Sequence, residues 1–364
     1  MKYKSLLAIL VIAVLVVGTF STSAFALKII ELPDAAPIDD IRIIEHGNNK
    51  LMVRNLYTTF DETFNSDFYL SGPGEFPAVA DLILKVGPTI RCSGTLLDDE
   101  IHVLTAAHCV TDARGKLSLK NGFAVFEGNR IDVIKKQTFV HPDWNGDSLE
   151  GSDLAILTLE SSPVIDNNPI VGHAIDKSPT GDLGCNQNKF DKAGYGRSGW
   201  GGDGDVASSG VKRNGQNCYD DTADQLLAVF RISTTTPHSI LHYDFDNGES
   251  KNDAYGTHFG KSHLGLGSNE VNSAPGDSGG PTFNGSGEIT GVTSYGITFS
   301  LVDTGSTDID NKLNSSFGEV SGDTRVSTFS DWIDSVLTVS EPPPDDEGPK
   351  PCPPGKERRG LCST

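Results

Sequence analysis

The sequence is short of positive charge. Its 364 residues include 29 lysines and arginines against 49 aspartates and glutamates, which gives a formal net charge of −20. Nucleic acids and anionic membrane surfaces attract basic proteins, so this balance argues against both as partners. We expect a solvated acidic surface that keeps the protein in solution.

The chain also lacks a second long apolar run. Residues 6–17 are continuously apolar, and nothing later is long enough to span a bilayer. Lys2 and Lys4 precede the run, and Ala24-Phe25-Ala26 follows it as an A-x-A cleavage site. This pattern predicts a signal peptide over residues 1–26 and a secreted protein, extracellular or periplasmic, that keeps no membrane attachment. An uncleaved anchor is the alternative.

No histidine follows residue 263, and this absence bears on the motif Gly276-Asp277-Ser278-Gly279-Gly280. The motif matches the G-x-S-x-G elbow of α/β-hydrolases, in which the acid and then the histidine follow the serine. Nothing after Ser278 could act as its base, so that fold is excluded. The small neighbours leave the hydroxyl accessible and let backbone N–H groups point at a substrate oxygen.

A serine hydroxyl needs a neighbouring base to become a nucleophile, and the candidates lie upstream of the motif. His108 follows the apolar run Leu104-Thr105-Ala106-Ala107, and Asp153 stands before the strand-like run Leu154-Ala155-Ile156-Leu157. These three segments, in the order His, Asp, Ser, resemble the trypsin/chymotrypsin family of serine endopeptidases. The resemblance covers residues 74–337.

The resemblance implies a catalytic triad of His108, Asp153 and Ser278 and an oxyanion hole formed by the N–H groups of Gly276 and Ser278. It also implies that Ser294, Tyr295 and Gly296 pair with substrate backbone and that Asn272 forms the floor of the specificity pocket. Asn272 is neutral, which argues against a strict preference for arginine or lysine, although Asp323 could supply charge at the pocket wall.

The chain lacks the family's I-V-G-G start. In family members the ammonium of that start pairs with the aspartate before the nucleophile, which here is Asp277. Counting back from Gly74 leads instead to Asn65-Ser66-Asp67-Phe68, and the nearest basic-then-aliphatic site, Arg42-Ile43-Ile44, lies too far upstream without an insertion. We therefore assign Asp277 to activation and leave the activating cleavage open.

Six cysteines in an exported chain suggest three disulfides. The resemblance implies a Cys92–Cys109 bridge beside His108. Proximity in the sequence suggests Cys185 with Cys218 and Cys352 with Cys362. Ala274 stands where the family has a cysteine four residues before the nucleophile, so the pocket wall must be held in some other way.

Short strand-like runs separated by turn residues begin at residue 78. They include residues 78–86, 101–106, 131–140, 154–159, 226–232 and 289–294, and residues 326–337 have the apolar spacing of an amphipathic helix. Together with the resemblance, these runs predict an all-β fold of two antiparallel six-stranded barrels, chymotrypsin-like, with a C-terminal helix. His141, after one of the runs, is expected to be structural.

The composition divides the chain into four parts. We expect a signal peptide over 1–26, a propeptide over 27–63, a trypsin-like protease domain over 64–339 and a Pro-rich acidic tail over 340–364. We predict a monomer that acts on protein or peptide substrates.

No metal or cofactor is predicted. Asp244-Phe245-Asp246-Asn247-Gly248 is similar to a calcium loop, but its glycine comes one place early and no glutamate follows at the required position. A solvated acidic loop is the expectation there.

The leading hypothesis is a secreted serine endopeptidase that acts through an acyl-enzyme intermediate. The main alternative is a catalytically inactive, protease-like binding module, since no I-V-G-G start is visible. An esterase on the same fold is a third possibility.

Overall fold

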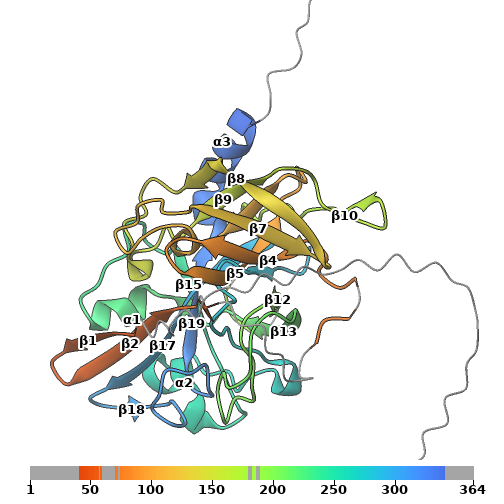
Figure 1. Ribbon diagram of the computed structural model, residues 1–364. Helices are drawn as coiled ribbons and strands as arrows, with labels where there is room; N and C mark the ends of the chain where they lie inside the picture. Colours follow the sequence, from red (N-terminus) through yellow and green to blue (C-terminus); the bar gives the residue numbers. More distant parts are fainter. Residues whose placement is uncertain are drawn as a thin grey trace, which may run out of the picture. The chain divides into compact units, whose positions relative to one another are not determined.

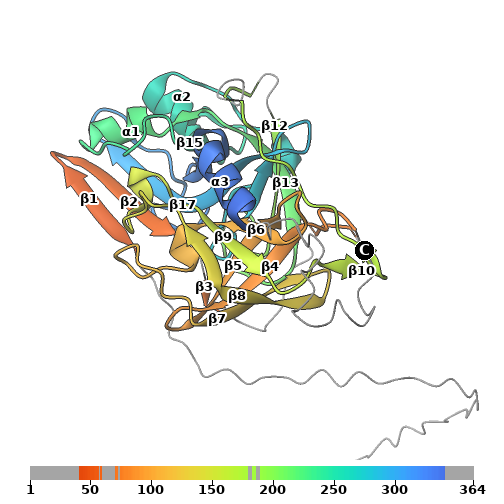
Figure 2. The ribbon, with the colours of Figure 1, turned by 90° about the horizontal axis from the view of Figure 1, so that it is seen from above.

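The computed structural model describes residues 41–56, 58–59, 70–72, 74–178, 183–185 and 189–340. The predicted signal peptide, about half of the predicted propeptide, the tail after Ser340 and the predicted Cys352–Cys362 bridge lie outside these residues. Within them, strands predominate and helices are few (Figures 1 and 2). The predicted all-β, chymotrypsin-like fold class is confirmed.

The first barrel lies in the N-terminal half of the chain. Its sheet comprises β3 (Thr58–Thr59), β4 (Val79–Lys85), β5 (Thr89–Leu96), β6 (His102–Thr105), β7 (Asn121–Phe126), β8 (Asn129–Val140) and β9 (Ala155–Leu159). Strands β4 to β9 close on themselves because β5 pairs with both β4 and β6. Almost every residue of β4, β5, β6 and β9 is buried, and these side chains form the barrel core.

The main strands of the second sheet system come from the C-terminal half of the chain. Its main strands pair in the order β13 (Arg213–Cys218), β12 (Lys189–Gly194), β16 (Pro281–Phe283), β17 (Ile289–Leu301), β19 (Val320–Arg325), β15 (Ile240–Asp244) and β14 (Asp221–Thr222). The remaining elements are β10 (Val164–Ile165), β11 (Asn168–Pro169), β18 (Gly305–Ser306), α1 (Asp224–Val229) and α2 (Ala254–Phe259).

A hairpin before the first barrel joins the second sheet. Its strands are β1 (Arg42–His46) and β2 (Asn49–Asn55), and β2 pairs antiparallel with β17. Figures 1 and 2 show this hairpin beside β17. Leu51 and Val53 point inward and join a hydrophobic cluster with residues of β17, α1 and α2.

The strand predicted over residues 226–232 is wrong, because the chain forms helix α1 there. Leu226, Leu227 and Phe230 are buried while Gln225 and Ala228 are exposed, and positions i, i+1 and i+4 share one face only in a helix. A seven-residue apolar run does not distinguish helix from strand by periodicity alone.

The predicted C-terminal helix is present as a short 3-10 turn, Val326–Phe329, followed by α3 (Ser330–Ser340). Phe329, Ile333 and Val336 are buried in the cluster that also contains the first-barrel core. The ring of His141 lies edge-on between Phe329 and Trp332, at 4.8 and 4.9 Å between centroids. His141 is a packing residue in this arrangement. No helix within the described ranges is long and apolar enough to cross a membrane.

Candidate active site

The structure brings His108, Asp153 and Ser278 together. His108 lies in a 3-10 turn, Ala107–Cys109, that follows β6, and Asp153 precedes β9, the partner of β6. His108 Nδ1 is 2.6 Å from Asp153 Oδ2, and the His108 backbone N–H donates to Asp153 Oδ1 at 2.9 Å. These two bonds fix both the ring and the backbone of the histidine.

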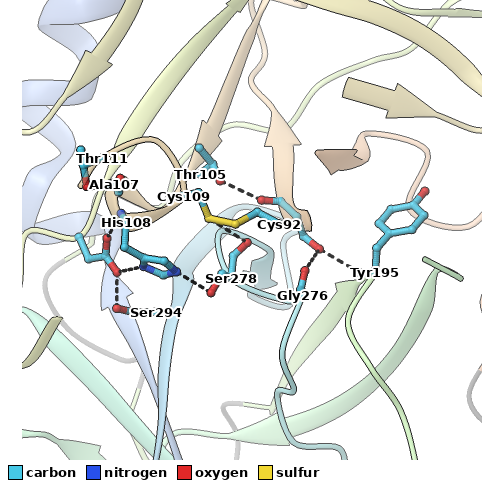
Figure 3. The surroundings of a disulfide bond; sticks show 12 residues. Cys92, Thr105, Ala107, His108, Cys109, Thr111, Tyr195, Gly276, Ser278 and Ser294 are labelled. Atoms are coloured by element: carbon cyan, nitrogen blue, oxygen red, sulfur yellow. Dashed lines mark hydrogen bonds and ion pairs between the residues drawn. A yellow bond between two sulfur atoms is a disulfide. The ribbon is translucent and has the colours of Figure 1, made fainter. Parts of the chain in front are cut away.

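Ser278 arrives from the other half of the chain, in the turn before β16. Its Oγ is 2.6 Å from His108 Nε2, so hydroxyl, imidazole and carboxylate form one continuous chain (Figure 3). All three residues are at most 7% exposed. Ser294 Oγ donates a further hydrogen bond to Asp153 Oδ2 at 2.5 Å, which supports the carboxylate from β17.

Strand β5 holds the nucleophile turn. The Ser93 backbone N–H donates to Ser278 O at 2.7 Å, and Ser93 Oγ donates to Gly276 O at 3.0 Å. Gly279 has a φ of +80°, and a Cβ on it would lie 2.0 Å from Thr105 Oγ1 and 2.4 Å from Ser93 O. Only glycine therefore fits the close approach of the turn to the first barrel.

Two of the three predicted disulfides lie in the described residues, and both are confirmed. Cys92–Cys109 joins β5 to the turn of His108, with a Cα–Cα distance of 6.4 Å (Figure 3). Cys185–Cys218 ties a loop to the end of β13. The first bridge couples the strand that holds Ser278 to the residue next to His108.

The N–H groups of Gly276 and Ser278 point at one acceptor, as expected for an oxyanion hole. Both donate to the backbone carbonyl oxygen of Leu56, at 2.5 and 3.0 Å. Gly276 adopts a φ of +105°, which only glycine reaches without strain. An oxygen of the chain itself therefore accepts both of the N–H groups that the sequence predicts to form an oxyanion hole.

Asp277 is buried beside this turn. Its Oδ1 accepts the Gly196 N–H at 2.8 Å and its Oδ2 accepts the Ala274 N–H at 2.9 Å. Burial raises the pKa of the carboxyl, and the two N–H bonds oppose that shift. A cavity of about 90 Å³, lined in part by Gly194, Gly196 and Asp277, adjoins the carboxylate.

Side-chain hydrogen bonds brace the segment before the nucleophile, where Ala274 replaces a cysteine. Tyr243 Oη and Ser273 Oγ are 2.5 Å apart, and Ser321 Oγ donates to Asn272 Oδ1 at 2.6 Å. Ser294, Tyr295 and Gly296 lie on β17, opposite the end of β2.

Asp323 is fully buried and already paired. Lys192 Nζ lies 3.3 Å from each of its oxygens, and the Tyr219 hydroxyl donates to Oδ2 at 2.8 Å. Its charge is thus balanced inside the protein rather than offered to a ligand.

The acidic loop predicted to be solvated is buried at its two aspartates. Asp244 and Asp246 are 2% and 5% exposed, so that prediction is wrong for both side chains. They lie with Asp253 in a group whose carboxylate oxygens are within 4.8 Å of one another.

Sequence reasoning assigned no role to Ser93 and missed Leu56 altogether. Ser93 follows Cys92 as an ordinary small residue, and its contacts with Gly276 and Ser278 span more than 180 positions. Leu56 follows the short apolar run Leu51-Met52-Val53. A short apolar run is consistent with a buried strand, so it could have indicated an ordered segment inside the predicted propeptide.

Comparison with known proteins agrees with this geometry. The model of the trypsin family matches residues 70–218 and 238–333 of the chain. Proproteinase E of Bos taurus is 26% identical over 255 residues, which cover 68% of this chain and 83% of that protein.

Proposed function

The chain belongs to the trypsin family of serine peptidases, and on this premise we propose that it is a secreted serine endopeptidase acting through His108, Asp153 and Ser278. His108 takes the proton of the Ser278 hydroxyl as Oγ attacks the scissile carbonyl, and later gives a proton to the leaving amine. Asp153 orients the imidazole and stabilises its protonated form.

The observation that carries the proposal is the unbroken hydrogen-bonded chain from Asp153 through His108 to Ser278, with 2.6 Å at each link between side chains. Two aligned N–H donors, on Gly276 and Ser278, lie where negative charge would develop in the transition state. In comparable enzymes one such donor contributes about 3 kcal/mol.

Export and activation are further parts of the proposal. The basic, apolar and A-x-A elements of residues 1–26 support secretion. Asp277 fixes the oxyanion turn through its two backbone hydrogen bonds, and a new terminal amine could reach it through the adjoining cavity. Protein or peptide substrates follow from the family membership.

A catalytically inactive binding module is the alternative. The observation in its favour is that the chain's own Leu56 occupies the oxyanion site. The two functions differ in reactivity, because only a working triad reacts covalently with a serine-directed phosphonate.

Replacement of the nucleophile tests the proposal. Ser278→Ala should lower hydrolysis of a peptide library by on the order of 10⁴-fold or more and abolish phosphonate labelling, because it removes the hydroxyl that lies 2.6 Å from His108 Nε2. Ser286→Ala, at an exposed turn serine, is the matched control and should keep full activity. Equal hydrolysis by wild type and Ser278→Ala would disprove the assignment, and hydrolysis of ester substrates without hydrolysis of the matching amides would favour an esterase.

A further inference from the structure

Strand β2 lies in the cleft as an extended peptide would. It pairs antiparallel with β17 from Tyr295↔Asn55 to Ser300↔Lys50, and the Leu56 N–H donates to Ser294 O at 3.4 Å. An extended peptide that adds a strand to an open sheet edge gains main-chain hydrogen bonds of this kind. The edge of β17 that the hairpin covers begins at Ser294, Tyr295 and Gly296, the segment expected to pair with substrate backbone.

Leu56 ends this pairing at the nucleophile. Its carbonyl oxygen accepts both oxyanion N–H groups, and one of these donors is the N–H of Ser278 itself. The same Ser278 carries the hydroxyl whose proton acceptor, His108 Nε2, is 2.6 Å away. A donor pair on the carbonyl oxygen beside an activated hydroxyl is the arrangement needed for acyl transfer.

Beyond this point, Thr58 and Thr59 form β3, which pairs antiparallel with Arg91 and Ile90 of β5. The described residues therefore contact the second sheet up to Leu56 and the first barrel from Thr58.

The Leu56 side chain is fully buried and belongs to none of the hydrophobic core clusters. A Cβ on Gly296 would lie 3.2 Å from its Cδ2, so the missing side chain at position 296 leaves room for leucine. Asn272 is neutral and the charge of Asp323 is balanced by Lys192.

We propose that Ser278 cleaves the bond after Leu56 within its own molecule and that the protein prefers leucine-like residues before the cut. This inference rests on the proposed function. Ser278 Oγ bonds to the Leu56 carbonyl carbon as its proton passes to His108. The Leu56–Tyr57 bond then breaks, and His108 protonates the departing amine of residue 57. Water hydrolyses the Leu56 ester, which restores Ser278 and leaves a Leu56 carboxylate.

The test is to follow the full chain by mass spectrometry and N-terminal sequencing. Wild type should yield a product beginning with Tyr57, at a rate independent of protein concentration, and Ser278→Ala should stay uncut. Leu56→Asp should slow the cut by at least about 100-fold, since a carboxylate would replace a fully buried apolar side chain. Val171→Asp, at a 73% exposed position, is the matched control and should be cut at the wild-type rate.

Two outcomes separate this inference from the proposed function. A protein that hydrolyses library peptides while its Leu56–Tyr57 bond stays intact would overturn the self-cleavage and leave the endopeptidase standing. A protein that neither hydrolyses peptides nor reacts with a phosphonate, as wild type or as Leu56→Asp, would overturn both. A rate proportional to concentration would contradict cleavage within one molecule. A library preference for arginine or lysine would contradict the leucine specificity.

A second inference concerns the buried acidic group and is independent of the first. Asp244, Asp246 and Asp253 are at most 5% exposed, and each has a carboxylate oxygen within 4.8 Å of the others. Glu270 Oε1 accepts the N–H of Asp246, which brings a fourth buried carboxylate to the group. Among the described residues no lysine or arginine forms an ion pair with any of the four.

The carboxylates are only partly satisfied. Asp244 accepts the Tyr255 N–H, and Asp253 accepts the Gly256 N–H and the Ser262 hydroxyl. Asp246 Oδ1 is buried and has no hydrogen-bond partner among the described residues. Buried charges of one sign require a compensating ion or protons.

The geometry points to a calcium site formed by Asp244, Asp246 and Asp253, because calcium prefers several carboxylate oxygens. The test uses the full chain carrying Ser278→Ala, which prevents self-cleavage, after removal of metal with a chelator. Calcium chloride at 100 times Kd should raise Tm by about 5 °C. Asp246→Asn should abolish that shift, and Asp203→Asn, at an exposed site, should keep it.

No effect of calcium on Tm, or an equal shift in Asp246→Asn, would overturn the site. If shared protons alone neutralise the group, Tm rises as the pH is lowered from about 8 to about 6 and calcium adds nothing, which also overturns it.

Discussion

His242 is a histidine whose side chain is completely shielded from water. It is fully buried, with Tyr255 Oη 2.6 Å from Nδ1 and Tyr295 Oη 2.6 Å from Nε2. Burial lowers its pKa to about 3. The imidazole is therefore neutral in the folded protein at every pH at which an unfolded chain would begin to protonate it.

We expect His242 to contribute to acid sensitivity. Its folded pKa lies below the unfolded value near 6.5, so the stability it supplies is complete above about pH 6.5 and is lost as the pH falls toward 3, at about 1.4 kcal/mol per pH unit. Urea unfolding of His242→Gln should show a shallower loss of stability across this range. His238→Gln, at a side chain 66% exposed, is the control. Parallel pH curves for wild type and His242→Gln would contradict the expectation.

At the scale of elements, the site depends on the docking of one turn against β5. Ser93 contacts the turn through its N–H and its hydroxyl, and Thr105 Oγ1 donates to Ser93 O at 2.8 Å. The disulfide Cys92–Cys109 starts from the neighbouring residue. A single strand thus sets the distance between Ser278 and His108.

Gly279→Ala should disturb this docking. A methyl group there meets Thr105 and Ser93 at impossible distances, so overpacking should add about 1–3 kcal/mol to the cost of the positive φ. Gly287→Ala has a similar φ, +78°, and open space around it, so it measures the backbone cost alone. Denaturant unfolding should place Gly279→Ala below Gly287→Ala, with a larger loss of activity. Equal stabilities would mean that the close approach has no energetic weight.

At the scale of the whole molecule, the features that the sequence predicts correctly are those carried by local motifs. The order of His108, Asp153 and Ser278 and the resemblance around them predicted the fold class and the groups that meet, because such motifs are local. Leu226 and its neighbours were assigned to a strand, since seven residues carry too little periodicity to exclude a helix. The contact of the Leu56 carbonyl oxygen with the N–H groups of Gly276 and Ser278 joins residues more than 200 positions apart, and no local sequence pattern contains such a contact.

The buried acidic group is a second case of this kind. A loop of aspartates ordinarily faces water, and its burial here results from contacts with Tyr255 and Glu270, which lie 11 and 24 positions beyond their partners. The early position of Gly248, compared with the glycine of a calcium loop, therefore does not indicate whether the carboxylates of Asp244, Asp246 and Asp253 lie close together.

The position of α3 has a consequence for biosynthesis. Phe329, Ile333 and Val336 share a core cluster with β4, β5, β6 and β9, although more than 160 residues separate them. A ribosome completes those strands long before it adds the helix that covers them. The N-terminal half therefore stays incompletely packed until the end of the chain emerges. A nascent chain stopped short of residue 330 would keep that apolar surface exposed to chaperones.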